Sequence, residues 1–207
     1  MTEGSVDHAL DWLHERAVAD DLPWEERWRA PLGTLMRWTG RFSAKTNLVG
    51  DATPMGIARE HLLEAFTVAA AIRRHRSRWQ TLVDVGAGAG MEVLTLGIIF
   101  PDASMCALEP RRKRADFIEV AGDAIGVSVD VVRGKLPDWT PATPFDVAVS
   151  RATFAPARWL ELAAPLVSSQ GLVLVHGAAD TAEALPCLDA LSVPGSADHQ
   201  ILVYQPA

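Results

Sequence analysis

From residue 81 onward, short apolar runs alternate with segments of helical periodicity, and this alternation restricts the chain to few folds. The sequence predicts strands at residues 81–85, 104–109, 129–133, 146–151, 171–177 and 200–205. Helices are predicted between them, near residues 91–100, 111–125, 156–166 and 180–191. Strands that alternate with helices form βαβ units, which predicts an α/β fold with a doubly wound, mostly parallel sheet. Ligands bind such sheets outside the carboxyl ends of the strands, where the strand order reverses.

The residues before this alternation have the apolar spacing of helices. We expect a helix over residues 6–20, a second helix up to Trp38, a loop over residues 43–54 and a third helix that begins at Pro54. Proline at a first helical position lacks only an N–H that would have no partner there, so Pro54 is a suitable start. We therefore expect a helical extension over residues 1–78, packed on a core over residues 79–207 as one compact unit.

The stretch "TLVDVGAGAG" places a small-residue loop after the first predicted strand, with glycine at positions 86, 88 and 90. A dinucleotide-binding loop would have the spacing GxGxxG, but position 91 is Met91. Asp84, just before the loop, would repel a pyrophosphate, whereas it can stabilise a cation. The ammonium and sulfonium groups of S-adenosylmethionine are such cations. The loop therefore predicts a site for this cofactor, contacted by Asp84, Gly86, Gly88, Gly90 and Met91.

Glu109 ends the second predicted strand, at the place where a carboxylate accepts hydrogen bonds from ribose hydroxyls in nucleotide-binding sheets. An acidic residue there could instead stabilise the start of the helix that follows. Together with the glycine loop and Asp84, the spacing of Glu109 favours the nucleotide cofactor.

The charge of the chain is −7, from 19 basic and 26 acidic residues, so no overall field attracts nucleic acid. Two basic runs stand out, "RRHRSR" at 73–78 and "RRKR" at 111–114. The first run precedes the first strand and should lie at the opposite edge of the sheet. The second run should start the helix after the second strand, beside the cofactor. Only the second run is therefore placed to meet the phosphates of an RNA substrate.

Other classes of protein lack support in the sequence. Cys106 and Cys187 have no CxxC spacing, and the six histidines form no common metal-ligand pattern, so we expect buried thiols and no metal. The longest apolar stretch, "VLTLGIIF", is too short to span a bilayer, and the first residues lack the basic region of a signal peptide. We expect a cytoplasmic, monomeric protein without a membrane partner.

Several motifs resemble one family. "EPRRKRADFI" is similar to the D-S-x-x-K-R-x-x-F-L segment of the bacterial 16S ribosomal RNA guanine-N7 methyltransferases, the glucose-inhibited division protein B family. "TNLVG" resembles its Y-N-L-T element, "REHLLEAF" its R-H-x-x-D-S-L helix, and "FDVAVSRA" its F-D-x-v-x-S-R-A strand and turn. The matches run in order from about residue 38 to 177, which makes chance resemblance improbable.

The resemblance implies a class I methyltransferase fold, which is Rossmann-like, with a helical N-terminal addition. It implies transfer of a methyl group from S-adenosylmethionine to guanine N7 in 16S rRNA of the 30S subunit. The implied cofactor contacts are Gly86, Met91, Glu109, Arg133, Gly134 and Arg151. We assign Asn47, Arg111, Arg112, Lys113 and Arg114 to the RNA substrate.

The chain also departs from the family pattern around this site. "MEVLTL" replaces the usual L-P-G-I-P-L and adds Glu92, Lys135 stands where an acidic residue is usual, and His176-Gly177 replaces K-G. These changes leave two alternatives open: a small-molecule methyltransferase on the same fold, or a non-catalytic module that binds the cofactor or the ribosome. No NPPY-like segment or cysteine follows the fourth strand, which agrees with N7 methylation.

Arg151 is the candidate catalytic residue, because it follows the fourth strand at the carboxyl edge. Its guanidinium could hold the O6 edge of guanine, or it could pair with a nearby acid such as Asp84 or Glu109, and both contacts could hold. For His61 we favour a partly buried helix residue bonded to a neighbour. We expect the N-terminal tryptophans to anchor the helices on the core.

Overall fold

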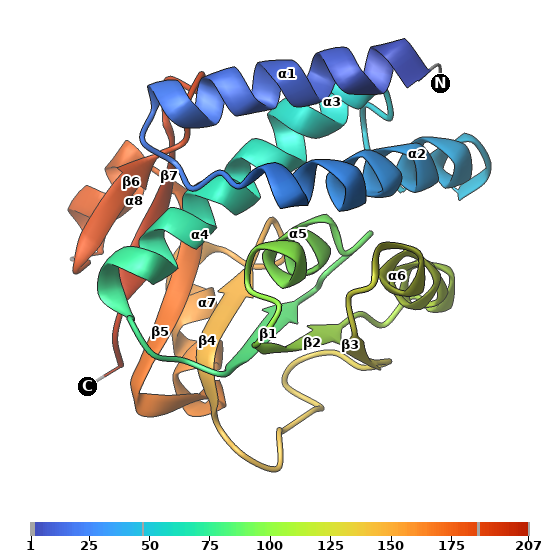
Figure 1. Ribbon diagram of the computed structural model, residues 1–207. Coiled ribbons are helices and arrows are strands. Elements are labelled where there is room, and N and C mark those ends of the chain that lie inside the picture. Colours follow the sequence, from blue (N-terminus) through green and yellow to red (C-terminus); the bar gives the residue numbers. More distant parts are fainter. Residues whose placement is uncertain (1–2, 47, 186, 207) are drawn as a thin grey trace.

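A single seven-stranded sheet forms the centre of the computed structural model, which describes residues 3–46, 48–185 and 187–206 (Figure 1). The strands are β1 (Thr81–Val85), β2 (Ser104–Leu108), β3 (Val129–Val132), β4 (Phe145–Ser150), β5 (Val167–Ala178), β6 (Asp189–Ser192) and β7 (His199–Tyr204). They lie in the order β3-β2-β1-β4-β5-β7-β6. All neighbouring pairs from β3 to β5 are parallel, and β7 is antiparallel to both β5 and β6. The predicted α/β fold with a mostly parallel sheet is confirmed.

Helices cover both faces of this sheet. On one face, α4 (Leu63–His75), α5 (Met91–Ile99) and α6 (Arg112–Ile125) share a large apolar core with the strands. On the other face, α7 (Pro156–Ala163) packs on β5, and α8 (Ala179–Ala184) follows that strand (Figure 1). Strands that are covered on both faces are apolar almost throughout. Asp84 in β1 is therefore unusual, as a buried acidic residue within such a strand.

The N-terminal helices add a further layer beside the same face. They are α1 (Glu3–Ala19), η1 (Glu26–Trp28), α2 (Arg29–Thr46) and α3 (Pro54–Ile57). Trp28 is buried, with its ring 6.0 Å from that of Phe66 in α4, so it anchors this layer as expected. The predicted boundary at residue 78 falls between α4 and β1. None of the described helices is both long enough and apolar enough to cross a membrane.

The helix that begins at Pro54 contains a change in its winding. Thr53 caps its start, since the Thr53 hydroxyl accepts a hydrogen bond of 3.0 Å from the Gly56 amide. After α3, residues Ala58–Leu62 form a π-helical turn, labelled η2, and α4 continues from it. Such wider turns are frequent at functional sites, because they displace side chains from their usual positions on a helix. His61 lies in this turn.

Two predicted elements were wrong. The second helix does not end near Trp38 but continues to Thr46, so residues 43–46 are not a loop. The reason is aromatic packing, since the Phe42 ring lies 5.4 Å from those of both Trp38 and Phe117. The helix predicted over residues 180–191 ends at Ala184, and β6 follows it. That short strand pairs with β7, and Leu191 is its only buried residue, so its sequence lacks a clear strand pattern.

Candidate functional site

The glycine loop joins β1 to α5 at the carboxyl edge of the sheet. Gly86, Gly88 and Gly90 have left-handed backbones, with φ of 74°, 59° and 69°. A Cβ atom on Gly86 would lie 2.2 Å from the hydroxyl oxygen of Thr153. A Cβ atom on Gly90 would lie 2.7 Å from Ile118. Glycine is therefore required here both by conformation and by close packing.

Glu109 connects this loop to the start of α6 through two hydrogen bonds. One of its carboxylate oxygens accepts a hydrogen bond of 2.8 Å from the Gly88 amide, and the other accepts one of 2.8 Å from the Arg111 amide at the start of α6. The side chain is buried. Glu109 thus stabilises the start of α6, which is the alternative role expected from the sequence. The predicted contact with a ribose stays a prediction, although each oxygen keeps a further lone pair that could accept it.

A cavity of about 230 Å³ lies above the loop. It is lined by Leu48, Val49, His61, Asp84, Gly86, Ala87, Gly88, Ala89, Met91, Glu92, Arg114, Arg151, Ala152 and Thr153. The structure therefore brings together residues from β1, its loop, the start of α6, the turn after β4 and the π-helical turn. Of the predicted cofactor residues, Gly90 and Glu109 lie just behind this lining.

Asp84 is the most unusual group in the cavity. It is buried, and its Oδ2 atom has no hydrogen-bond partner among the described residues. Burial raises the pKa of Asp84 well above its usual value, and the nearby charge of Glu92 raises it further. A cationic ligand would remove both effects by pairing with the carboxylate. The cavity thus fits the cationic end of S-adenosylmethionine, the cofactor predicted from the sequence.

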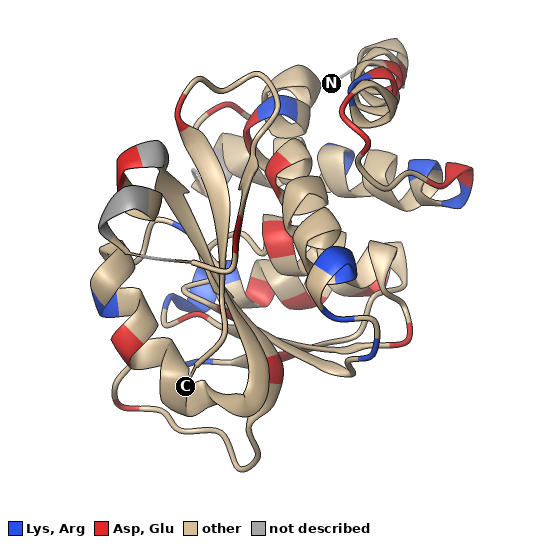
Figure 2. Cartoon of the chain, turned by 90° about the vertical axis from the view of Figure 1, so that its left-hand side faces the viewer, with Lys and Arg blue, Asp and Glu red and all other residues tan. Residues whose placement is uncertain are grey.

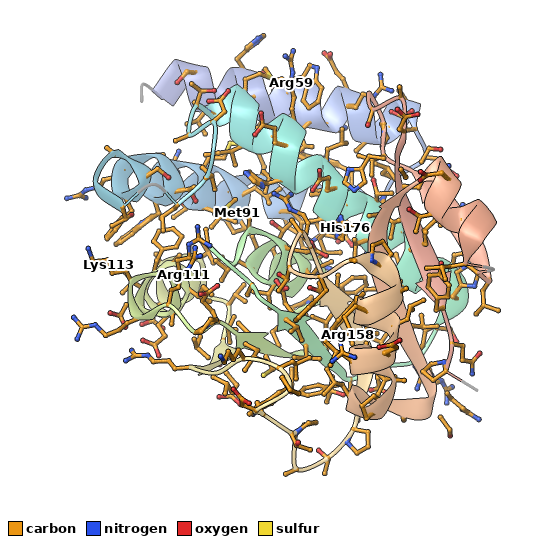
Figure 3. The ribbon with its side chains drawn as sticks, turned by 180° about the vertical axis from the view of Figure 1, so that it is seen from behind. Arg59, Met91, Arg111, Lys113, Arg158 and His176 are labelled. Atoms are coloured by element: carbon orange, nitrogen blue, oxygen red, sulfur yellow. The ribbon has the colours of Figure 1, made fainter. Side chains whose placement is uncertain are left out.

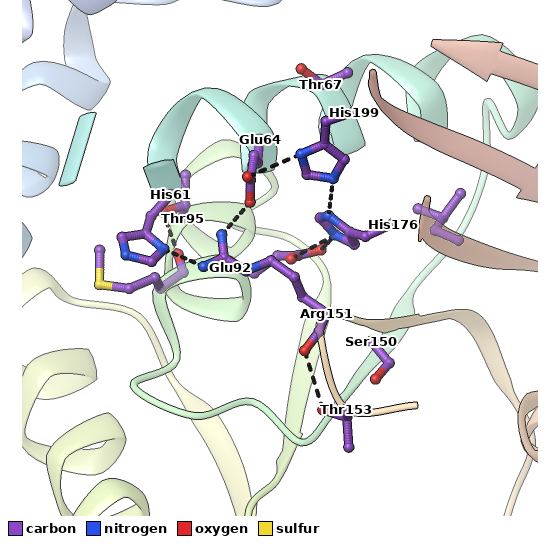
Figure 4. A network of polar contacts seen from close by, with 12 residues as sticks. His61, Glu64, Thr67, Glu92, Thr95, Ser150, Arg151, Thr153, His176 and His199 are labelled. Carbon is purple, nitrogen blue, oxygen red and sulfur yellow. Dashed lines mark hydrogen bonds and ion pairs between the residues drawn. The ribbon is translucent and has the colours of Figure 1, made fainter. Parts of the chain in front are cut away.

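Arg151 enters the cavity from the turn after β4, in which the next residue, Ala152, has a left-handed φ of 54°. Its guanidinium forms an ion pair with Glu64 and donates a hydrogen bond of 2.7 Å to the backbone oxygen of Glu60. It also lies 2.6 Å from Nδ1 of His61 (Figure 4). The expectation of an acidic partner is confirmed, but the partner is Glu64 on α4 instead of Asp84 or Glu109.

A chain of polar contacts continues from Glu64 to Glu92, which lines the cavity (Figure 4). Glu64 lies 3.2 Å from Nδ1 of His199, and Nε2 of His199 lies 3.2 Å from Nδ1 of His176. Nε2 of His176 in turn lies 3.0 Å from Glu92. Burial alone would raise the pKa of Glu64, but the contact with His199 and the charge of Arg151 outweigh it and lower that pKa.

Sequence reasoning noted Glu92 and His176 as departures from the family pattern but missed that they contact each other. It also missed His199, which reaches the chain of contacts because β7 lies beside β5. The only available signal was the position of His199 directly before the last predicted strand, residues 200–205. Across the described residues, no group of three or more histidine, cysteine or acidic side chains is arranged to hold a metal ion.

Several predicted residues lie away from the cavity. Arg133 forms an ion pair with Asp116 on α6, is about half exposed, and is not one of the residues that line the cavity. Gly134 follows β3 and packs near Leu108. Their predicted contacts with the cofactor stay predictions. Asn47, assigned to the substrate, lies outside the described residues.

The run at 111–114 starts α6 as predicted, with Arg111 as its N-cap. Arg111 and Lys113, both labelled in Figure 3, are exposed, and so is Arg112. Arg114 lines the cavity. The run at 73–78 spans the end of α4 and the segment before β1, at the opposite end of that strand. Figure 2 colours Lys and Arg blue along the whole chain, and it is their position relative to the cavity that distinguishes the two runs.

Comparisons with known proteins agree with this architecture. The family model described as rRNA small subunit methyltransferase G matches residues 32–202. A ribosomal RNA small subunit methyltransferase G from Chromohalobacter salexigens is 31% identical, and the alignment covers 92% of each chain. The protein of the same name from Methylobacillus flagellatus is 29% identical, and the alignment covers 93% of this chain and 94% of that relative.

Solved structures show the same fold at lower identity. The 16S rRNA N2 G1207 methyltransferase of Thermus thermophilus has a TM-score of 0.55 and 15% identity, covering 69% of this chain and 43% of that one. TrmN from Thermus thermophilus has a TM-score of 0.54 and 19% identity, covering 69% and 49%. The fold is that of the class I S-adenosylmethionine-dependent methyltransferases. Because the family model spans most of its length, the chain belongs to the rRNA small subunit methyltransferase G family.

Proposed function

We propose that this protein transfers a methyl group from S-adenosylmethionine to N7 of a guanine in 16S rRNA, within the 30S subunit. Membership of the family supports the substrate. The observation that carries the cofactor assignment is the buried Asp84 oxygen that faces the cavity without a partner among the described residues. Action as a monomer in the cytoplasm belongs to the same proposal.

The chemistry of guanine N7 suits this cavity. N7 has an in-plane lone pair and no proton to lose, so the reaction requires no general base. The cofactor supplies a methyl group on a positively charged sulfur. The contribution of the protein is then alignment of the two reactants, for which a rigid glycine loop and a closed network of side chains are suitable.

The charge balance of the site agrees with this reaction, because a positive charge passes from sulfur to the guanine ring. Asp84 and Glu92 line the cavity and are both buried. Carboxylates that are fixed before the reaction stabilise such a charge without reorganisation of water. The site therefore favours the charge both before and after the transfer.

Recognition of the RNA is assigned to the start of α6. Arg111, Arg112 and Lys113 are exposed beside the cavity, where they can contact phosphates on either side of the reacting base. Arg151 uses three of its five N–H groups on Glu60, Glu64 and His61. The others are available for the O6 edge of the guanine.

The experiment supplies labelled S-adenosylmethionine with unmodified 30S subunits, free 16S rRNA or a small-molecule extract. Label in 16S rRNA, with strand cleavage by aniline after borohydride reduction, is the expected result because that treatment detects N7-methylguanosine. Label only in small molecules would favour a metabolite methyltransferase. Cofactor binding without transfer would indicate a non-catalytic module. An Asp84→Asn variant is the matched control for cofactor-dependent label.

A further inference from the structure

His61 stands out among the cavity residues, because it lies in the π-helical turn and is 8% exposed. The turn shifts its imidazole to the wall of the cavity, next to Arg151. The sequence predicts His61 as a partly buried helix residue bonded to a neighbour. That bond exists, but it involves only one of the two ring nitrogens.

The contact with Arg151 determines the tautomer of this ring. A guanidinium has only N–H donors, so Nδ1 of His61, 2.6 Å from Arg151, must accept. The proton of the neutral ring is then on Nε2. Burial lowers the pKa of His61 to about 4, and the charge of Arg151 contributes to this, so the ring is neutral at physiological pH.

The Nε2–H group has no partner among the described residues, although it is fully enclosed. Buried donors are almost always hydrogen-bonded, so an unpartnered donor in the wall of a cavity points to a ligand that accepts. The same cavity holds the unpartnered acceptor of Asp84. One unpaired donor and one unpaired acceptor match the zwitterion of an α-amino acid, which carries an ammonium and a carboxylate on the same carbon atom.

We propose that Nε2–H of His61 donates a hydrogen bond to the α-carboxylate of S-adenosylmethionine, while Asp84 faces the ammonium. Arg151 is then a positioning residue as well, because it keeps the His61 proton on the side of the ligand. This inference rests on the cofactor in the proposed function and is independent of the RNA substrate.

The surrounding charges keep this arrangement in place. Glu64 fixes Arg151 from α4, and His199 of β7 contacts Glu64. His176 of β5 links His199 to Glu92 of α5. The imidazole is therefore held by a donor at Nδ1, while its Nε2–H group, in the wall of the cavity, has no partner among the described residues.

The test compares two ligands and two variants by calorimetric titration of the full-length protein. The ligands are S-adenosylhomocysteine and its decarboxylated analogue, an adenosyl thiopropylamine. His61→Asn keeps an acceptor near the position of Nδ1 but removes the donor. His61→Gln places an amide donor near the position of Nε2. His75→Asn is the control. Nε2 of His75 lies 2.8 Å from a carboxylate oxygen of Asp189, and neither residue lines the cavity.

We expect His61→Asn to weaken binding of S-adenosylhomocysteine by about tenfold to a hundredfold, as for loss of a hydrogen bond to a charged group. Binding of the decarboxylated analogue should stay within about twofold. His61→Gln should recover much of the lost affinity, and His75→Asn should change neither ligand. In ¹⁵N-labelled protein, the His61 Nε2 resonance should shift with S-adenosylhomocysteine and much less with the analogue.

Equal losses for both ligands in His61→Asn, or no loss for either, would overturn the assignment, because the carboxylate would then not be the partner. Failure of the unchanged protein to bind S-adenosylhomocysteine would overturn this inference and the proposed function together. Binding with the expected ligand pattern but without RNA methylation would overturn only the proposed function.

Discussion

Acid should destabilise this protein through His61, and the size of the effect follows from its surroundings. The pKa of His61 falls from an ordinary 6.5 to about 4 in the folded chain, first because of burial and then because of Arg151. Between these values the unfolded chain binds a proton at His61 and the folded chain does not. The stability from this residue is therefore complete above about pH 6.5 and decreases as the pH falls towards 4.

The difference of about 2.5 pH units corresponds to about 3 kcal/mol at pH 4 and about 2 kcal/mol at pH 5, at roughly 1.4 kcal/mol per unit. Urea unfolding of the unchanged protein and of His61→Asn at pH 7, 5 and 4 measures it. Asp84 acts in the opposite direction, because its raised pKa makes the folded chain bind a proton first. Both proteins retain Asp84, so the difference between them isolates His61. Parallel curves within about 0.5 kcal/mol would refute the reasoning.

Three further outcomes are expected. Because the pKa of Asp84 is raised, pairing of this group with the cofactor ammonium should release up to about one proton. The affinity for the cofactor, measured by calorimetric titration, should therefore rise with pH in the unchanged protein and should not depend on pH in Asp84→Asn. Gly86→Ala should lower the free energy of unfolding by about 1–3 kcal/mol, because its Cβ meets Thr153 at 2.2 Å and its φ is 74°; unchanged stability would contradict this. Arg111→Ala should reduce the salt slope of RNA binding by about one, and Arg78→Ala should leave it unchanged.

The sequence was sufficient for those parts of the site that depend on local structure. Asp84 and the glycines are placed by one strand and the turn after it, so recognising the strand places them at the carboxyl edge. Glu109 ends the next strand, and its position beside the loop follows from the parallel pairing of β1 and β2. In each case a short segment determines the position, and apolar periodicity reveals the segment.

Contacts that depend on helix packing could not be predicted in this way. Arg151 and Glu64 are 87 positions apart, and they meet because the helix over η2 and α4 crosses above the end of β4. Nothing in either local pattern specifies that crossing. The strand β6 was missed for a different reason: it has four residues, and its only buried side chain is that of Leu191, so apolar alternation does not reveal it.

Two departures from the family pattern, Glu92 and His176, raise the question of whether the site still functions. The contact between these two residues is more informative than either residue alone. Glu92 is 8% exposed, and a carboxylate buried without a partner would destabilise the fold strongly. His176 lies 3.0 Å from it and is itself buried, so each change supplies the partner that the other needs. Random decay of an unused site would not be expected to leave such a matched pair beside an intact glycine loop. Because the pair also supports Glu64 through His199, it stabilises the residues that hold Arg151 and His61 at the cavity. The arrangement therefore favours an active methyltransferase in which the Glu92–His176 pair, instead of the usual family residues, stabilises the site.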